Sequence, residues 1–233
     1  MSADIEVIEP KLYSGSVADE IAACLSDVIG EKGKASIMLS GGSTPSTVYR
    51  ALSAPPRVSE VDWPKVSFFF GDERWVPHSD VQSNYRMANE TLFSQLPAEG
   101  EVFPINTSLK TPEEGARDYD KVLKSNLNNG KIDILLLGIG EDGHTASLFP
   151  DSNLLNEKDS FVGATVNPND KSERISITPE VIFNAERIIF IVKGDSKKEI
   201  VKRIIEGTDS PNIYPVTLYK SSKGKVTWFL DSA

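Results

Sequence analysis

Apolar residues recur along this chain in two rhythms, one typical of helices and one typical of buried strands. Val17, Ile21, Cys24, Leu25 and Val28 follow the spacing of an amphipathic helix, in which Cys24 is interpreted as a small core residue. Short apolar runs between polar segments predict strands at residues 35–40, 65–70, 132–137, 174–178 and 187–192.

Further helices are indicated by residues that favour helix ends. Thr44 and Ser83 are expected to cap two helices, because a hydroxyl there accepts a hydrogen bond from free backbone N–H groups. Pro45 suits the first turn of the first helix, and the second is expected to run to about Leu96. Two more helices are predicted at residues 112–127 and 196–205, and residues 214–219 and 225–230 flank a Ser-Ser-Lys-Gly turn that predicts a C-terminal hairpin.

The alternation of strands and helices predicts an α/β fold. We expect a doubly wound, Rossmann-like domain centred on a parallel sheet, with helices on both faces and the hairpin at its C-terminus. The whole chain, residues 1–233, is expected to form this one domain. Ligands of such sheets bind beyond the carboxyl ends of the strands. The loops after the strands at 35–40, 65–70 and 132–137 are therefore expected to meet at one edge.

The first of these loops has the sequence SGGSTP at residues 40–45. Its glycines let the backbone approach a ligand closely, and the following helix offers free N–H groups and the positive end of its dipole. Gly42, Ser43 and Thr44 are therefore candidates for binding a phosphate. A glycine turn in front of a capped helix explains the same residues, so this loop alone leaves both interpretations open.

The second loop, GDERWVP at residues 71–77, places charges directly after an apolar strand. Arg74 can bind a phosphate or carboxylate through two parallel hydrogen bonds. A surface ion pair between Glu73 and Arg74 is the alternative, but the position at the predicted edge favours a function for Asp72 and Arg74. His78 is interpreted as an exposed loop residue.

The third loop, GIGEDGHTASLFP at residues 138–150, contains the pattern G-x-G-x-x-G after a strand. A dinucleotide is disfavoured, because Glu141 and Asp142 would place negative charge where a pyrophosphate would sit. Asp142 and His144 are instead interpreted as a catalytic pair, since a carboxylate can orient an imidazole and stabilise its cation. The alternative, a capping aspartate beside a structural histidine, is weakened because the chain has only two histidines.

Composition narrows the range of partners. The net charge of −9 disfavours nucleic acid, so a small anionic ligand would need a local group of cations. No apolar run approaches the ~20 residues that span a bilayer, and the first residues lack a secretory pattern. We therefore expect no membrane partner and a cytoplasmic location. Cys24 is the only cysteine, which excludes an internal disulfide and a multi-cysteine zinc site.

Taken together, these segments resemble the 6-phosphogluconolactonase family, which belongs to a wider group with the glucosamine-6-phosphate deaminases. The matching segments are SGGSTP, GDERWVP, SNYRM at 83–87, GIGEDGHTASLFP, RISIT at 174–178 and GDSK at 194–197. The resemblance spans nearly the whole chain, and the third loop is its most specific part.

The resemblance implies a hydrolase of the pentose phosphate pathway that uses neither a metal nor a cofactor. Its substrate would be a phosphosugar lactone, 6-phospho-D-glucono-1,5-lactone, and its product 6-phosphogluconate. The resemblance makes His144 the general base and Asp142 its helper. It implies that Arg74 and Arg174 contact the substrate. It also implies that the phosphate is bound by Gly42, Ser43, Thr44 and Lys197. Asp72 joins the substrate-binding set because of its position at the edge.

Two other functions were weighed against this one. In the deaminases the segment after the Gly-His pair resembles Ile-Ala-Phe-Asn-Glu-Pro and carries a catalytic glutamate. Leu148 and Phe149 stand in that segment here, and neither can transfer a proton. A non-catalytic sugar-phosphate sensor would carry an added DNA-binding module, whereas only about one helix is predicted before the first strand here.

Overall fold

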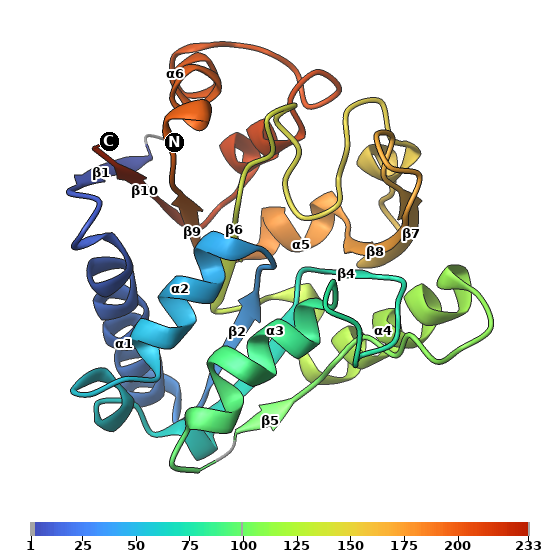
Figure 1. The fold of residues 1–233 in the computed structure, drawn as a ribbon. Helices are drawn as coiled ribbons and strands as arrows, with labels where there is room; N and C mark the ends of the chain where they lie inside the picture. The colour runs from blue at the N-terminus through green and yellow to red at the C-terminus, as the bar shows by residue number, and fades with distance from the viewer. Residues whose placement is uncertain (1–2, 99, 233) are drawn as a thin grey trace.

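A computed structural model describes residues 3–98 and 100–232, which form a large parallel sheet flanked by helices and a smaller sheet beside it (Figure 1). The strands are β1 (Asp4–Ile8), β2 (Ala35–Leu39), β3 (Val66–Phe70), β4 (Asp72–Arg74), β5 (Glu101–Val102), β6 (Ile134–Leu137), β7 (Val162–Val166), β8 (Glu173–Ile177), β9 (Arg187–Val192) and β10 (Lys225–Asp231). The α-helices are α1 (Tyr13–Lys32), α2 (Ser43–Leu52), α3 (Asn84–Thr91), α4 (Pro112–Asn126), α5 (Pro179–Asn184) and α6 (Lys198–Glu206). The 3-10 helices are η1 (Arg57–Ser59), η2 (Trp63–Lys65), η3 (Phe93–Gln95), η4 (Asn128–Gly130), η5 (Asn153–Asn156), η6 (Asp195–Lys197) and η7 (Pro215–Ser221).

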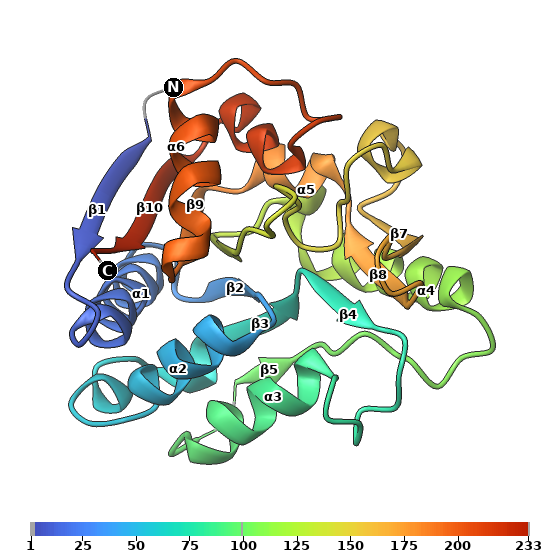
Figure 2. The same ribbon diagram turned by 45° about the horizontal axis from the view of Figure 1, so that its top comes forward.

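The larger sheet has seven strands in the order β1-β10-β9-β6-β2-β3-β5, and all neighbouring pairs are parallel. Every residue of the central strand β6 is buried, as expected where both faces of a sheet are covered. The helices α1, α2 and α3 lie side by side, and α4 lies against the smaller sheet (Figures 1 and 2). The predicted parallel α/β architecture is confirmed.

The smaller sheet is antiparallel, with the strand order β4-β8-β7. The predicted strand at 174–178 exists as β8, but it pairs with β4 and β7 rather than with the large sheet. Because β4 directly follows β3, the chain passes from the end of the large sheet into the small one at residue Gly71. The small sheet therefore stands beside the carboxyl ends of the parallel strands.

The predicted C-terminal hairpin is wrong. Residues 214–219 lie largely in η7, and β10 runs parallel to both β9 and β1. Pro215 has no N–H group to donate to a sheet and fits the start of a helical turn. The edge strand β1 was missed, although its residues alternate between polar and apolar.

The predicted helix caps had mixed outcomes. Ser83 caps α3, and its side chain accepts a hydrogen bond from the backbone N–H of Arg86 at 3.2 Å. The cap predicted at Thr44 is wrong, because α2 begins at Ser43 and is preceded by Gly42 with a φ of 107°. Glycine adopts this left-handed conformation without strain, so the chain enters the helix earlier than the hydroxyl pattern indicated.

Candidate active site

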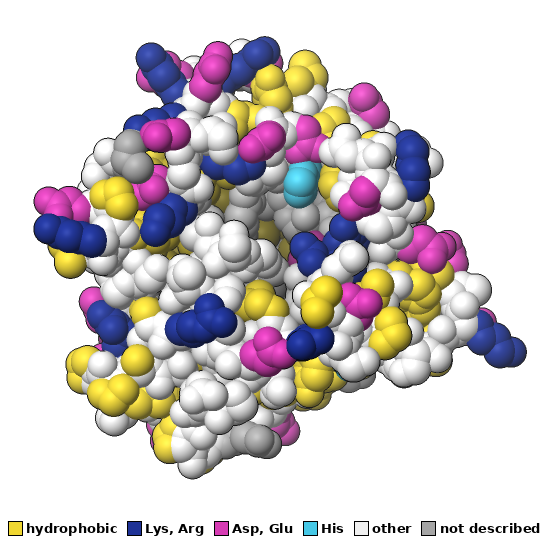
Figure 3. All heavy atoms as spheres, in the orientation of Figure 1, with side chains coloured by type: hydrophobic (Ala, Val, Ile, Leu, Met, Phe, Trp, Pro, Cys, Tyr) yellow, Lys and Arg dark blue, Asp and Glu magenta, His cyan; other side chains and the backbone are white. Residues whose placement is uncertain are grey.

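The three predicted loops meet in one pocket of about 150 Å³ at the carboxyl ends of β2, β3 and β6. Its walls are Ser40, Gly41, Asp72, Arg74, Gly138, Ile139, Gly140, His144, Thr145 and Ala146. A space-filling view of this face shows a hollow bordered by a histidine and by lysine or arginine side chains (Figure 3). The expectation that segments far apart in sequence converge here is confirmed.

His144 and Asp142 form a close pair at this pocket. Nδ1 of His144 lies 2.5 Å from Oδ1 of Asp142, and the same oxygen accepts the backbone N–H of His144 at 3.1 Å. Burial raises the pKa of Asp142, but the hydrogen bond and charge of His144 outweigh burial and hold that pKa below its usual value. An ionised carboxylate accepts a hydrogen bond from the Nδ1–H group, so the lone pair of the neutral imidazole is on Nε2.

At Gly140 the third loop leaves no room for a side chain, because His144 and Asp142 lie directly against it. A Cβ atom on Gly140 would lie 2.1 Å from Nδ1 of His144 and 2.6 Å from Oδ1 of Asp142. The N–H of Gly140 donates to the carbonyl of His144 at 2.9 Å. Thr145 then ties the loop back to its start, since its hydroxyl donates to the carbonyl of Gly138 at 2.9 Å.

Two arginines lie next to each other at the small sheet. Arg74 in β4 and Arg174 in β8 are register partners, and Arg74 lines the pocket. Burial, followed by the neighbouring charge of Arg74, lowers the pKa of Arg174. Arg174 has a carboxylate partner in Asp170 at 3.5 Å. Among the described residues, Nε of Arg74 is buried without a hydrogen-bond partner, whereas its Nη1 donates to the carbonyl of Gln82 at 2.5 Å.

The remaining predicted phosphate ligands lie around the pocket rather than in its wall. Gly42, Ser43 and Thr44 form the start of α2, directly after the lining residues of the first loop. Lys197 ends η6 just before α6, and its ammonium lies 3.7 Å from Oε1 of Glu141 in the third loop. Lys197 is thus brought to the third loop from a distant part of the chain.

Asp72 lines the pocket, but its carboxylate is already occupied by protein donors. Oδ1 accepts from the Asn84 amide at 3.0 Å, and Oδ2 accepts from the Ser147 hydroxyl at 2.7 Å. Neither donor was assigned a role from the sequence. Both stand inside the family-like segments at 83–87 and 138–150, which was the available signal for them.

The alternative in which Glu73 forms a surface ion pair with Arg74 is wrong. Glu73 is buried, with 1% of its surface exposed. Its carboxylate accepts hydrogen bonds from the backbone N–H groups of Arg74, Asn84 and Tyr85 and from the hydroxyl of Ser83. The free N–H groups at the start of α3 attract this negative charge, so Glu73 fixes the second loop on the helix.

The interpretation of His78 as an exposed residue is also wrong. His78 is half-buried, with Nε2 at 2.8 Å from the carbonyl of Ile105 and its ring at 4.6 Å from the ring of Tyr85. Its neighbours in sequence are polar, so only the tertiary contact with Tyr85 explains its burial. His78 does not line the pocket.

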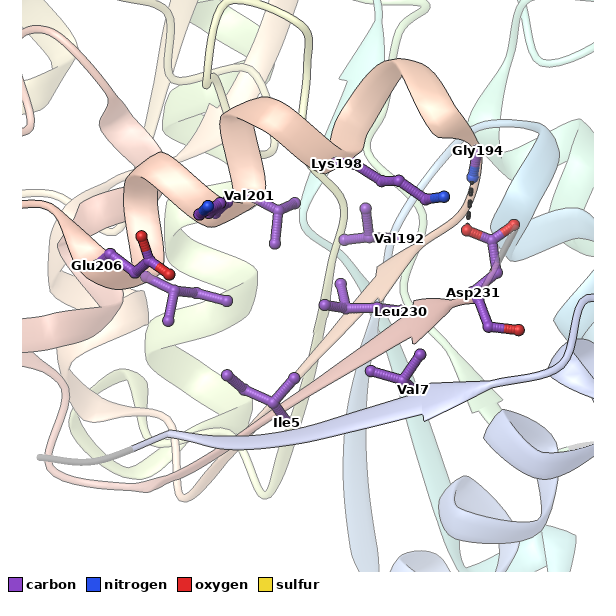
Figure 4. A pocket seen from close by; sticks show the side chains of 12 residues that line it. Ile5, Val7, Val192, Gly194, Lys198, Val201, Glu206, Leu230 and Asp231 are labelled. Atoms are coloured by element: carbon purple, nitrogen blue, oxygen red, sulfur yellow. Dashed lines mark hydrogen bonds between the residues drawn. The ribbon is translucent and has the colours of Figure 1, made fainter.

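A larger groove of about 450 Å³ lies elsewhere, between α6 and the strands β1 and β10 (Figure 4). Its walls are mainly apolar, with Ile5, Val192, Val201 and Leu230 among them. At one end Asp231 accepts the N–H of Gly194 at 2.9 Å, which uses up that donor. An apolar groove with its end donor already bonded is poorly suited to a phosphorylated sugar, so the smaller pocket is the candidate site.

Two further searches covered residues 3–98 and 100–232. Within them, no three or more His, Cys, Asp or Glu side chains come together as a metal site requires. None of the helices in the same residues combines the length and apolar character needed to cross a membrane. Cys24 is buried in the core, as predicted.

Comparison with known proteins agrees with the resemblance. The sequence model of the family described as glucosamine-6-phosphate isomerases/6-phosphogluconolactonase matches residues 9–228. The chain is 37% identical over 200 residues to the 6-phosphogluconolactonase of Haemophilus influenzae, covering 84% of each chain. It is 36% identical over 223 residues to the human 6-phosphogluconolactonase, covering 93% of this chain and 84% of the human one.

Solved structures give the same result. The 6-phosphogluconolactonase of Trypanosoma brucei superposes with a TM-score of 0.87 at 31% identity, covering 99% of this chain and 96% of that one. The 6-phosphogluconolactonase of Shewanella baltica gives a TM-score of 0.90 at 27% identity, covering 99% and 98%. The chain therefore belongs to the family of glucosamine-6-phosphate isomerases and 6-phosphogluconolactonases.

Proposed function

We propose that this chain hydrolyses 6-phospho-D-glucono-1,5-lactone to 6-phosphogluconate in the oxidative pentose phosphate pathway. The observation that carries the proposal is the 2.5 Å contact between Asp142 and His144, of which His144 lines a pocket together with Arg74. The relatives reported above carry the name 6-phosphogluconolactonase, which supports the same reaction for this chain.

In this reaction His144 acts as the general base. A lactone is an activated ester, so a water molecule positioned by the base is sufficient and no covalent nucleophile is needed. Nε2 takes a proton as the water oxygen bonds to the lactone carbonyl, and Asp142 stabilises the resulting imidazolium. The tetrahedral intermediate then collapses, the ring C–O bond breaks, and the imidazolium returns its proton to the departing oxygen.

Charge complementarity supports a phosphorylated substrate. The chain has a net charge of −9, so an anion requires local compensation. Arg74, Arg174 and Lys197 supply positive charge around the pocket, and the N-terminus of α2 adds backbone donors at Gly42, Ser43 and Thr44. Either a pocket N–H group or Arg74 is suited to stabilise the oxyanion.

A glucosamine-6-phosphate deaminase is the second candidate, because the same family includes such enzymes. Leu148 and Phe149 argue against it, since both are buried and neither can act as an acid or base. The decisive assay offers fresh 6-phosphogluconolactone and glucosamine 6-phosphate to the same preparation. We expect accelerated lactone hydrolysis and no ammonia release; ammonia without lactone hydrolysis would reverse the assignment.

We also propose that residues 1–233 act as one domain in the cytoplasm, with a small phosphosugar lactone as the partner and no nucleic acid or membrane. The pairing of β1 with β10 supports the single domain, because it joins the first and last strands of the sheet. The acidic net charge of −9 disfavours binding to nucleic acid.

Activity is expected to be independent of added metal. The proposed base is an imidazole, and the carbonyl of a lactone is reactive enough without a Lewis acid. Hydrolysis should therefore proceed at the same rate in the presence of EDTA, after subtraction of the uncatalysed rate. Loss of activity with EDTA that zinc or magnesium restores would contradict the proposed mechanism.

Phosphate recognition is expected to depend on Arg74, Arg174 and Lys197. A hydrogen bond to a charged group contributes about 1.5–3 kcal/mol, so replacing any one with alanine should raise KM roughly 10- to 100-fold. Lys198→Ala is the matched control, since Lys198 is an exposed neighbour of Lys197 that pairs with Asp195. If gluconolactone without phosphate is hydrolysed as efficiently as the phosphorylated form, the proposed phosphate site is wrong.

A further inference from the structure

The carboxylate of Asp72 joins three segments of the chain at the wall of the pocket. Asp72 begins β4, Asn84 begins α3, and Ser147 follows His144 in the third loop. All three side chains are buried, with exposed fractions of 9%, 3% and 2%. Each oxygen of the carboxylate accepts one hydrogen bond, from Asn84 at 3.0 Å and from Ser147 at 2.7 Å. We call these three residues the Asp72 junction.

Ser147 is the point where the catalytic loop is attached to this junction. Its backbone N–H donates to the hydroxyl of Ser176 in β8 at 3.1 Å, so both its side chain and its backbone are held. Between it and His144, Ala146 has a φ of 48°, a conformation that a residue with a Cβ atom adopts only when its surroundings impose it. The turn that carries His144 is therefore fixed from the Ser147 side.

Asn84 attaches the first loop to the same junction. Its amide also donates to the backbone carbonyl of Asp72 at 2.9 Å. A Cβ atom on Gly41 would come within 2.0 Å of the Asn84 side chain, so the first loop packs directly on that amide. The junction thus holds all three pocket loops in one arrangement.

We propose that Asp72 and Ser147 are positioning residues, whose hydrogen bond sets the place of His144 relative to the substrate carbonyl. This inference rests on the proposed lactone hydrolysis and adds two roles to it. Asp72 is less suited than His144 to act as the base, because each of its oxygens already accepts a hydrogen bond from a buried donor. Since misplacing a reacting group by about 1 Å can reduce a rate roughly 100-fold, loss of this contact should reduce kcat more than it affects binding.

The test compares kcat and KM for Ser147→Ala, Ser147→Thr and Asp72→Ala, together with the double variant Ser147→Ala/Asp72→Ala. Thr91→Val is the control, because Thr91 is equally buried and its hydroxyl donates to the carbonyl of Met87 away from the pocket. Ser147→Ala is expected to lower kcat roughly 10- to 100-fold with a small change in KM. Ser147→Thr keeps the hydroxyl and should recover most of the loss.

The double variant separates positioning from folding. If the hydrogen bond is what matters, removing the Ser147 hydroxyl after Asp72→Ala should lower kcat little further, so the two effects are strongly non-additive. Ser147→Ala with the parent kcat, and a thermal midpoint lowered as in Thr91→Val, would overturn the proposal. If Ser147→Ala does not fold, the Ser147→Thr and Asp72→Ala proteins carry the test, because a parent-like kcat in Asp72→Ala also overturns it. An inactive parent protein would instead reject the lactonase function itself.

Discussion

His144→Ala is expected to lose at least about 100-fold in kcat, since general-base catalysis contributes on the order of 10²- to 10⁴-fold. His144 is the only histidine among the described residues that line the pocket, and its Nδ1 lies 2.5 Å from Oδ1 of Asp142. Asp142→Asn should be intermediate, because the amide oxygen can still orient the ring but does not stabilise its cation. Rates must be taken at short times near neutral pH, after subtraction of a reaction without enzyme.

His78→Ala is the natural control for that experiment, because it removes the other histidine of the chain. His78 contacts Tyr85 and the carbonyl of Ile105 rather than the pocket. The variant should therefore keep its kcat while its thermal midpoint falls. A folded His144→Ala protein that keeps most of its net activity would remove the central claim. Asp142 would then be the better candidate for the base, since the carboxylate of Asp72 is already engaged.

The sequence predicted the parts of the fold that depend on local pattern. Residues 134–137 of the apolar run at 132–137 form the fully buried strand β6, and the helix predicted at 112–127 has the bounds Pro112–Asn126. The terminal hairpin failed because strand direction is decided by distant partners. Residues 225–230 have the composition of a strand, but only the presence of β9 and β1 on either side makes the pairing parallel.

The candidate site likewise contains residues that could be placed from the sequence and residues that could not. The convergence of three loops followed from the topology of a parallel sheet, so Asp142, His144, Asp72 and Arg74 could be placed together in advance. The buried position of Glu73 could not, because it depends on the N-terminus of α3, which lies eleven residues further along the chain. The same is true of Ser147 and Asn84, whose hydrogen bonds to Asp72 join segments that share no local pattern.

Gly140→Ala is expected to reduce kcat roughly 100-fold, because the added methyl group displaces the proposed base. The new Cβ atom would lie 2.1 Å from Nδ1 of His144 and 2.6 Å from Oδ1 of Asp142, far inside the contact distance of real atoms. Either the imidazole must leave Asp142 or the loop must move, and both displace Nε2. KM should change less, because Arg174 and Lys197, the proposed phosphate-binding residues, belong to other elements, β8 and η6.

Gly138→Ala provides the matched comparison within the same loop. Its Cβ atom would meet only the hydroxyl of Ser40, at 3.9 Å, which is an ordinary contact. Gly30→Ala, in the last turn of α1 with nothing within 4 Å, controls for the substitution itself and should be silent or slightly stabilising. Steady-state kinetics and thermal unfolding of the three variants distinguish an effect of Gly140→Ala on catalysis from an effect on folding.

A Gly140→Ala protein with the parent kcat would mean that the contact between Asp142 and His144 is not needed for the reaction. A proportional loss in kcat and in folded fraction would make the glycine a requirement of folding rather than of catalysis. We expect a folded Gly140→Ala protein whose kcat approaches that of His144→Ala. Both changes remove the proposed base from its position beside the attacking water molecule.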